Sequence, residues 1–191
     1  MKNTTRLLIA GLAATAALPA LAHSGVDHVH GFVAGFTHPL FGWDHLLAMF
    51  SVGVWSAQQG GRHVWALPLS FVATMAVGGA LGMAGFSMGF TEAAIAVSVI
   101  AFGLLIAQAR SLPTWLSALA CSLAALAHGI AHGGELPQDG NPWGYAGGFL
   151  LATALLHCTG ILFGKMGAGH GRWQRGFGLL ASLAGGYLLL A

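Results

Sequence analysis

Runs of apolar residues alternate with short polar breaks along most of the chain, and this pattern predicts membrane-spanning helices. A helix needs about 20 mostly apolar residues to cross the hydrocarbon core of a bilayer. Six stretches after the N-terminal region meet this requirement, at 39–58, 65–85, 91–109, 114–133, 143–164 and 174–190. We therefore expect an all-α, polytopic membrane protein with six transmembrane helices.

The N-terminal residues have the features of a cleavable signal peptide. Lys2 and Arg6 precede a short apolar run, and residues 20–22 are Ala-Leu-Ala, which suits signal cleavage. The chain is thus predicted to consist of a signal peptide over 1–22 and one six-helix transmembrane domain over 23–191. The alternative is an uncleaved first helix. It leaves the topology unchanged, because Lys2 and Arg6 would hold the N-terminus inside.

The positions of the charged residues orient these spans. If the mature N-terminus lies outside, every later Lys and Arg falls in an inner segment: Arg62, Arg110, Lys165, Arg172 and Arg175. The outer segments then contain the acidic residues Asp27, Glu92, Glu135 and Asp139. Cytoplasmic loops carry an excess of basic residues. We therefore predict a multi-pass protein of the bacterial inner membrane with both ends of the mature chain outside.

Composition agrees with a membrane protein and excludes some partners. The chain is 56% hydrophobic and only 6% charged, whereas soluble domains carry roughly 25% charged residues. Its net charge of +2 is too small to favour nucleic-acid binding. Glycines at G-x-x-x-G spacing can let transmembrane helices approach closely, and three such pairs occur: Gly78 and Gly82, Gly144 and Gly148, and Gly160 and Gly164.

Two histidine-containing motifs lie at the ends of apolar spans. The first, His38-Pro-Leu-Phe-Gly-Trp-Asp44-His45, opens the first span, and the second, His128-Gly-Ile-Ala-His132-Gly-Gly-Glu135, closes the fourth. Charged groups at mid-bilayer cost roughly 3 kcal/mol or more and are usually functional. The i, i+4 and i+7 spacing puts the second motif's polar side chains on one helix face.

Imidazoles and carboxylates at similar depth suit a borderline divalent cation. We predict a metal site at the outer mouth, with Pro39 and Gly42 loosening the backbone of the first motif. The candidate ligands are His38, Asp44, His45, His128, His132 and Glu135. The alternative is a hydrogen-bonded polar cluster without a metal.

Further residues are candidates for the ion pathway or for ion capture. His157 lies deeper, in the fifth span, and Met49 is one helical turn below His45. A histidine that bonds across helices and a packing methionine are the respective alternatives. The predicted mature N-terminus can capture a divalent ion loosely or can simply be a solvated polar end. Its candidate residues are His23, Asp27, His28 and His30.

The two motifs resemble the H-x5-D-H and H-G-x-x-H-G-x-E signatures of the HupE/UreJ family. The length, signal peptide and six spans match as well, although Ala127 stands where the family commonly has an aromatic residue. The resemblance implies a secondary permease for nickel, or alternatively cobalt, that supplies hydrogenase or urease maturation. It implies that the six motif residues carry transport. It also implies a protein that is not an enzyme and has no permanently bound cofactor.

Other classes remain open. One is a membrane accessory protein that binds and delivers metal without transport, and another is an intramembrane cytochrome with paired histidine ligands to haem. A metalloprotease is disfavoured because the chain lacks an H-E-x-x-H motif, and no G-x-x-x-x-G-K-[ST] loop couples ATP. The expected partners are the divalent ion and the bilayer. The metal, the energy coupling and the oligomeric state, a homo-oligomer included, stay open.

Overall fold

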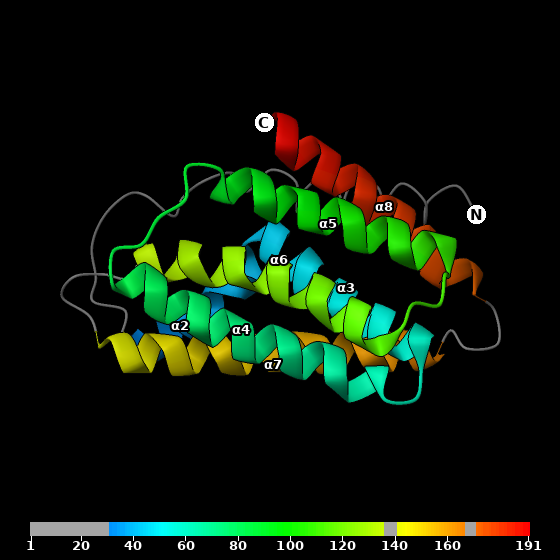
Figure 1. The fold of residues 1–191 in the computed structure, drawn as a ribbon, viewed down its shortest axis with the longest axis horizontal. Coiled ribbons are helices and arrows are strands. Elements are labelled where there is room, and N and C mark those ends of the chain that lie inside the picture. The colour runs from blue at the N-terminus through cyan, green and yellow to red at the C-terminus, as the bar shows by residue number, and fades with distance from the viewer. Residues whose placement is uncertain (1–30, 136–140, 167–170) are drawn as a thin grey trace, which may run out of the picture.

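The computed structural model describes residues 31–135, 141–166 and 171–191, and within them the chain forms seven α-helices. They run along the length of the molecule, with α5 and α8 side by side at one edge (Figure 1). The helices are α2 (Gly31–Phe41), α3 (Trp43–Gln59), α4 (His63–Met83), α5 (Thr91–Gln108), α6 (Thr114–Gly134), α7 (Pro142–Met166) and α8 (Arg172–Leu190). The all-α prediction is confirmed for the described part of the chain.

Four of these helices, α4 to α7, are long and apolar enough to cross a membrane. Their ends agree with the predicted spans to within a few residues. The first and last predicted spans correspond to α3, which has only 17 residues, and to α8, whose first turn contains Arg172 and Arg175. The chain therefore has the character of a helical membrane protein, while the six-span topology and the position of its ends stay predictions. The predicted signal peptide over 1–22 lies outside the described residues.

The prediction of one continuous span over 39–58 is wrong at its start. Gly42 is extended, with φ −80° and ψ 112°, and it separates α2 from α3. Pro39 lies inside α2, so the break comes at the glycine. The pattern did not predict α2, because this helix has 11 residues and is too short to cross a bilayer. The break puts His38 and His45 on different helices.

Glycines set the close contacts between helices. A Cβ atom at Gly78 of α4 would lie 2.6 Å from the carbonyl oxygen of Leu126 and 3.1 Å from the Cα atom of Gly129, both on α6. Gly53 of α3 and Gly160 of α7 meet in the same way. Such contacts are typical of membrane helices packed through small residues. The structure places all three predicted G-x-x-x-G pairs at helix contacts: α4 with α6, α2 with α7, and α3 with α7.

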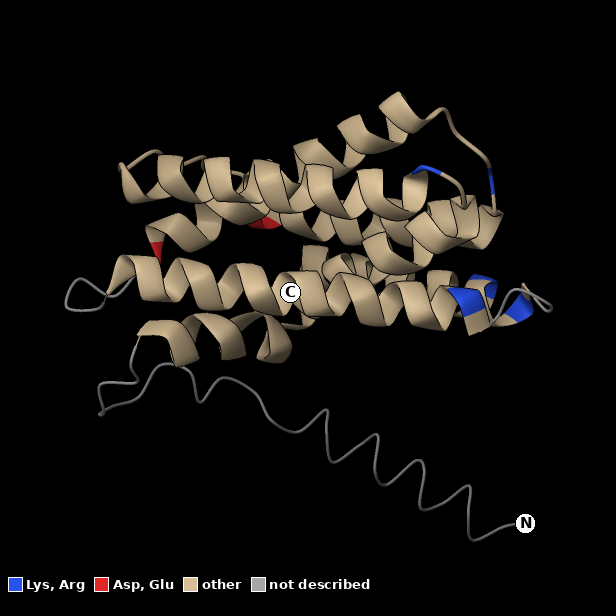
Figure 2. Ribbon diagram, turned by 90° about the horizontal axis from the view of Figure 1, so that it is seen from below, with Lys and Arg blue, Asp and Glu red and all other residues tan. Residues whose placement is uncertain are grey.

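Charged residues separate along the helix axes. Basic residues gather at one end of the bundle, and the acidic residues lie away from it (Figure 2). The basic end contains the residues that precede α4 and follow α5, the end of α7 and the start of α8: Arg62, Arg110, Lys165, Arg172 and Arg175. The acidic residues within the described ranges are in the first turns of α3 and α5 and just after α6: Asp44, Glu92 and Glu135. This is the separation that the predicted orientation requires.

Candidate metal centre

Three helices bring the four motif histidines together. His38 lies near the end of α2, His45 in the first turn of α3, and His128 and His132 in the last two turns of α6. The ring centroids of His45 and His132 are 4.1 Å apart, those of His38 and His132 4.6 Å, and those of His45 and His128 5.0 Å. The two motifs, which are distant in sequence, thus meet in one cluster.

Asp44 orients the imidazole of His45. Its Oδ1 atom accepts a hydrogen bond from the backbone N–H of His45 at 2.9 Å and lies 2.5 Å from Nδ1 of the ring. A hydrogen on Nδ1, assigned from this contact, leaves the Nε2 lone pair available. Nε2 of His45 faces Nε2 of His132 in direct contact. Carboxylates that bond the far nitrogen of a histidine are common behind metal ligands.

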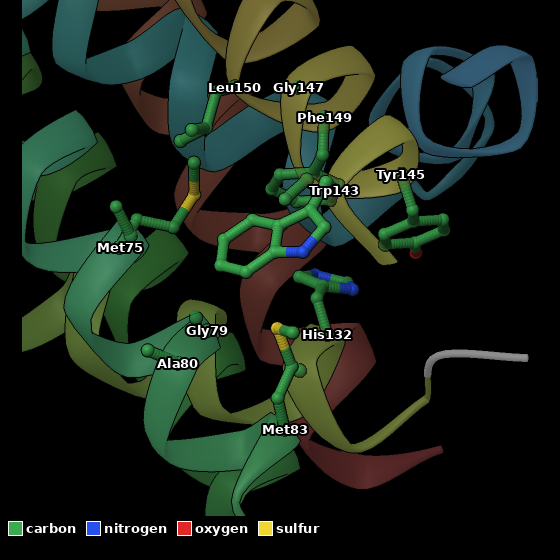
Figure 3. A pocket seen from close by; sticks show the side chains of 14 residues that line it. Met75, Gly79, Ala80, Met83, His132, Trp143, Tyr145, Gly147, Phe149 and Leu150 are labelled. Carbon is green, nitrogen blue, oxygen red and sulfur yellow. The ribbon is translucent and has the colours of Figure 1, made fainter. Parts of the chain in front are cut away.

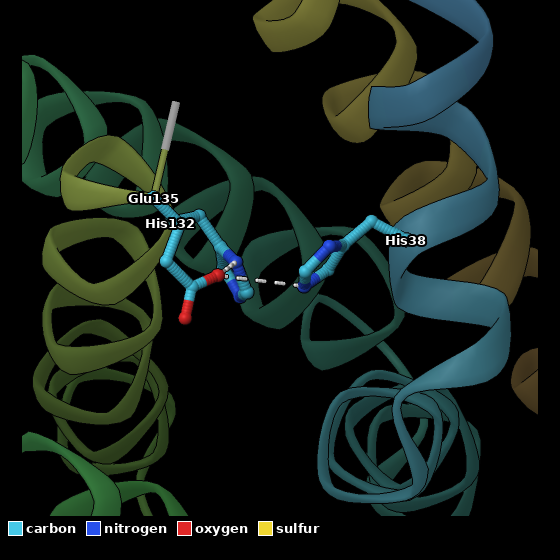
Figure 4. Close-up of side chains that lie close together, drawn as sticks. All are labelled: His38, His132 and Glu135. Atoms are coloured by element: carbon cyan, nitrogen blue, oxygen red, sulfur yellow. Dashed lines mark ion pairs between the residues drawn. The ribbon is translucent and has the colours of Figure 1, made fainter. Parts of the chain in front are cut away.

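Glu135 lies close to two histidines of the cluster. It follows α6 directly, and its Oε2 atom lies 3.3 Å from Nδ1 of His132 and 3.7 Å from Nε2 of His38 (Figure 4). One possible ligand atom from each of these three residues lies within 4.8 Å of the others. Two imidazoles from α6 and α2 and a carboxylate could therefore hold one metal ion.

The polar side chains become steadily less exposed from the surface inward. The side chain of Glu135 is 52% exposed and that of His38 is 36% exposed, while His132 is only 5% exposed. His128 is fully buried. Its Nδ1 atom donates to the carbonyl oxygen of Ala124 at 3.0 Å, and its Nε2 atom has no hydrogen-bond partner among the residues that the structure describes. The cluster is thus exposed at Glu135 and His38 and buried at His128.

Aromatic residues of α7 form one wall of the cluster, and the sequence pattern did not predict them. The ring of Phe149 lies 4.4 Å from that of His132 and 6.1 Å from that of His38, and Tyr145 lies 6.3 Å from His38. Their i, i+4 spacing was the available signal. Aromatic residues at this spacing usually pack in a core, so only the fold distinguishes them.

The other candidate residues fall into two groups. Met49 and His157 are buried below the cluster, on α3 and α7. The candidates for ion capture at the predicted mature N-terminus lie outside the described residues: His23, Asp27, His28 and His30. Their role stays a prediction.

A cavity of about 560 Å³ lies beside the cluster, between α4, α6 and α7. His132 faces it, together with Trp143 and Tyr145 (Figure 3). Most of the remaining lining is alanine, glycine, methionine and other apolar residues. Apolar side chains have no ligand atoms that could replace the water bound to a divalent cation. We therefore do not assign the ion pathway to this cavity.

The fold and the cluster define a class, namely a helical membrane protein with buried imidazoles beside carboxylates. The family model described as HupE / UreJ protein matches residues 11–188. The chain is also 43% identical to Protein HupE of Rhizobium leguminosarum bv. viciae over 179 residues. This aligned region covers 93% of this chain and 91% of that relative. The chain belongs to the HupE/UreJ family, as its two motifs predicted. No solved structure matches it.

Proposed function

We propose that this protein is a secondary transporter of nickel, with cobalt as the alternative substrate, across the bacterial inner membrane into the cytoplasm. The nickel would supply hydrogenase or urease maturation. The observation that carries the proposal is the pair of Nε2 atoms of His45 and His132, which face each other while Asp44 and Glu135 lie on the Nδ1 sides of the same rings. A contact between two imidazole nitrogens is satisfied either by a hydrogen on one of them or by a cation that both rings bind after a small separation, and the two carboxylates beside the rings favour the cation.

The carboxylates make a divalent guest tolerable at this depth. In a low-dielectric site, an uncompensated double charge would be very unfavourable. Asp44 and Glu135 together balance the charge of one divalent ion, and the imidazoles are neutral. The graded exposure from Glu135 to His128 supports stepwise exchange of water for protein ligands.

The driving force need not involve a nucleotide. An inside-negative membrane potential attracts a cation at about 2.3 kcal/mol per elementary charge per 100 mV, and the effect doubles for a divalent ion. Neutral imidazoles bind a cation less tightly than charged ligands do, which lets the ion leave again. The proposed topology has six spans, with the metal cluster at the outer mouth and the basic end in the cytoplasm.

The geometry gives less support to a haem protein. The ring centroids of His45 and His132 are only 4.1 Å apart. A porphyrin with its iron does not fit between this pair.

Uptake of radioactive nickel into proteoliposomes tests the proposal. Wild-type protein should give saturable uptake that cobalt inhibits more strongly than zinc or copper, and His45→Ala should lower it by about tenfold or more. His63→Gln is the matched control. His63 begins α4 at the basic end of the bundle, away from the metal cluster, and it bonds the carbonyls of Gly60 and Leu112.

The same assay separates a permease from an accessory protein, since only a permease moves ions with no partner present. Absence of uptake by well-folded wild-type protein, or equal uptake by His45→Ala, would contradict the proposal.

A further inference from the structure

His157 is a polar side chain without a visible reason for its position. It lies in the middle of α7 with 1% of its surface exposed. Neither of its ring nitrogens has a hydrogen-bond partner among the described residues. Inside a membrane, water does not compensate for an unpaired donor or acceptor. A buried imidazole with two unpaired nitrogens therefore indicates a ligand that binds there.

Three further donors lie at neighbouring positions on three helices. Thr153 is one turn before His157 on α7, and its hydroxyl group donates to the sulfur of Met49 on α3 at 3.2 Å. The same hydroxyl lies 3.9 Å from the sulfur of Met75 on α4. All three side chains are buried. Thioether sulfur, hydroxyl and imidazole groups suit a borderline or soft metal ion better than a hard one such as magnesium.

These donors continue the outer cluster inward. Met49 is one turn below His45 on α3, and Thr153 is one turn below Phe149 on α7. The ring of Phe71 lies 5.7 Å from that of His128 and 5.2 Å from that of His157. Phe71 therefore stands between the innermost histidine of the outer cluster and His157.

We propose that His157, Thr153, Met49 and Met75 form a second, inner binding station for the same divalent cation. The inference rests on the proposed function, because the cation is the transported one. The station has no carboxylate, so it binds the ion more weakly than the outer centre does and releases it readily. Its sulfur and nitrogen donors favour nickel or cobalt over magnesium and calcium.

Counting bound ions tests the station without depending on transport. Equilibrium dialysis of the full chain in detergent, with radioactive nickel at saturation, should give one ion fewer for His157→Phe than for wild type. The double variant Met49→Leu, Met75→Leu should lose the same ion and the sulfur signal in the X-ray absorption of bound nickel. Met166→Leu is the control, because Met166 is exposed at the far end of α7.

Uptake by proteoliposomes tests whether the station lies on the pathway. His157→Phe should slow nickel uptake at least about tenfold and leave the affinity of the outer centre unchanged. His157→Gln, which keeps hydrogen-bonding atoms, verifies that any loss does not come from misfolding, together with the thermal unfolding of each variant. The inner station is overturned if folded His157→Phe binds as many ions as wild type or transports at the wild-type rate.

These outcomes stay distinct from failure of the proposed function. If wild-type vesicles take up nickel and His157→Phe does so equally well, only the inner station is wrong. If wild-type vesicles take up none, the transport proposal fails. The number of bound ions then still tests the inner station. Loss of one ion in His157→Phe supports the inner station, and no loss overturns it.

Discussion

The outer centre and the interior below it contain the same kind of ligand in opposite electrostatic settings. Around His45 and His132, two carboxylates lie against the far ring nitrogens, and the side chain of Glu135 is half exposed. The ring of Phe71 lies 5.2 Å from that of His157, and Thr153, one turn earlier on the same helix, lies near two methionine sulfurs. In the proposed transport, this difference has a physical sense: the charged groups lie where a hydrated cation would first be captured, and the neutral donors lie where it would have to be released.

The largest expected effect comes from removing the histidine that contacts most of the outer centre. His132 lies against His45 and Glu135, and its ring meets that of His38 in a T-shaped arrangement. We expect His132→Ala to weaken nickel binding at the outer centre by more than about 100-fold, since it removes a ligand and the contact between motifs. Isothermal titration with nickel, carried out on His132→Ala and on His157→Phe, measures the affinity of the outer centre in each variant. A smaller effect for His132→Ala than for His157→Phe would reverse the proposed order of the two sites.

The second prediction removes the charge and keeps the shape. Asp44→Asn should lower outer-centre affinity by about 10- to 100-fold, because the amide supports the His45 tautomer less well and compensates no charge. The number of ions bound at saturation should not change. Equilibrium dialysis measures both quantities. An unchanged affinity in Asp44→Asn would show that orientation by the carboxylate is unimportant.

Acidification should weaken the outer centre, because a protonated imidazole has no lone pair for a metal. Lowering the pH from about 7.5 to about 5.5 should reduce nickel affinity by only about two- to threefold, because burial favours the neutral imidazole and moves most of its protonation to lower pH. The measurement is best made on His157→Phe, which isolates the outer centre. Affinity that stays constant down to about pH 4 would argue against imidazole ligands.

The smallest expected effect concerns helix packing. A Cβ atom at Gly129 of α6 would lie 2.8 Å from the backbone nitrogen of Gly79 and 2.9 Å from the Cα atom of Gly78. Gly129→Ala should therefore destabilise the protein by about 1–3 kcal/mol and shift α6, which carries His128 and His132. We expect only a slight loss of outer-centre affinity, with His157 on α7 less affected.

Gly134→Ala is the matched control in the same helix, because a Cβ atom there meets nothing within 4 Å. Thermal unfolding in detergent compares the two variants. Equal melting temperatures would show that the contact between α4 and α6 tolerates the extra methyl group.

The sequence by itself determined the limits of the long apolar helices, and it predicted the depth of each motif. Hydropathy is a property of a continuous stretch of sequence and does not depend on tertiary contacts. For this reason the predicted limits of 65–85 and 114–133 agree closely with α4 and α6. The same local logic put His128, His132 and Glu135 on one face. It also separated the basic from the acidic ends, because basic residues are concentrated in cytoplasmic loops.

Only the tertiary structure decided which side chains face one another. The break at Gly42, the contact of His45 with His132 and the approach of Thr153 to two sulfurs depend on how each helix is rotated and how closely it packs. That rotation follows from glycine contacts between helices that are distant in sequence. A period of 3.6 residues gives a face to each helix, but it does not say which face of another helix lies opposite.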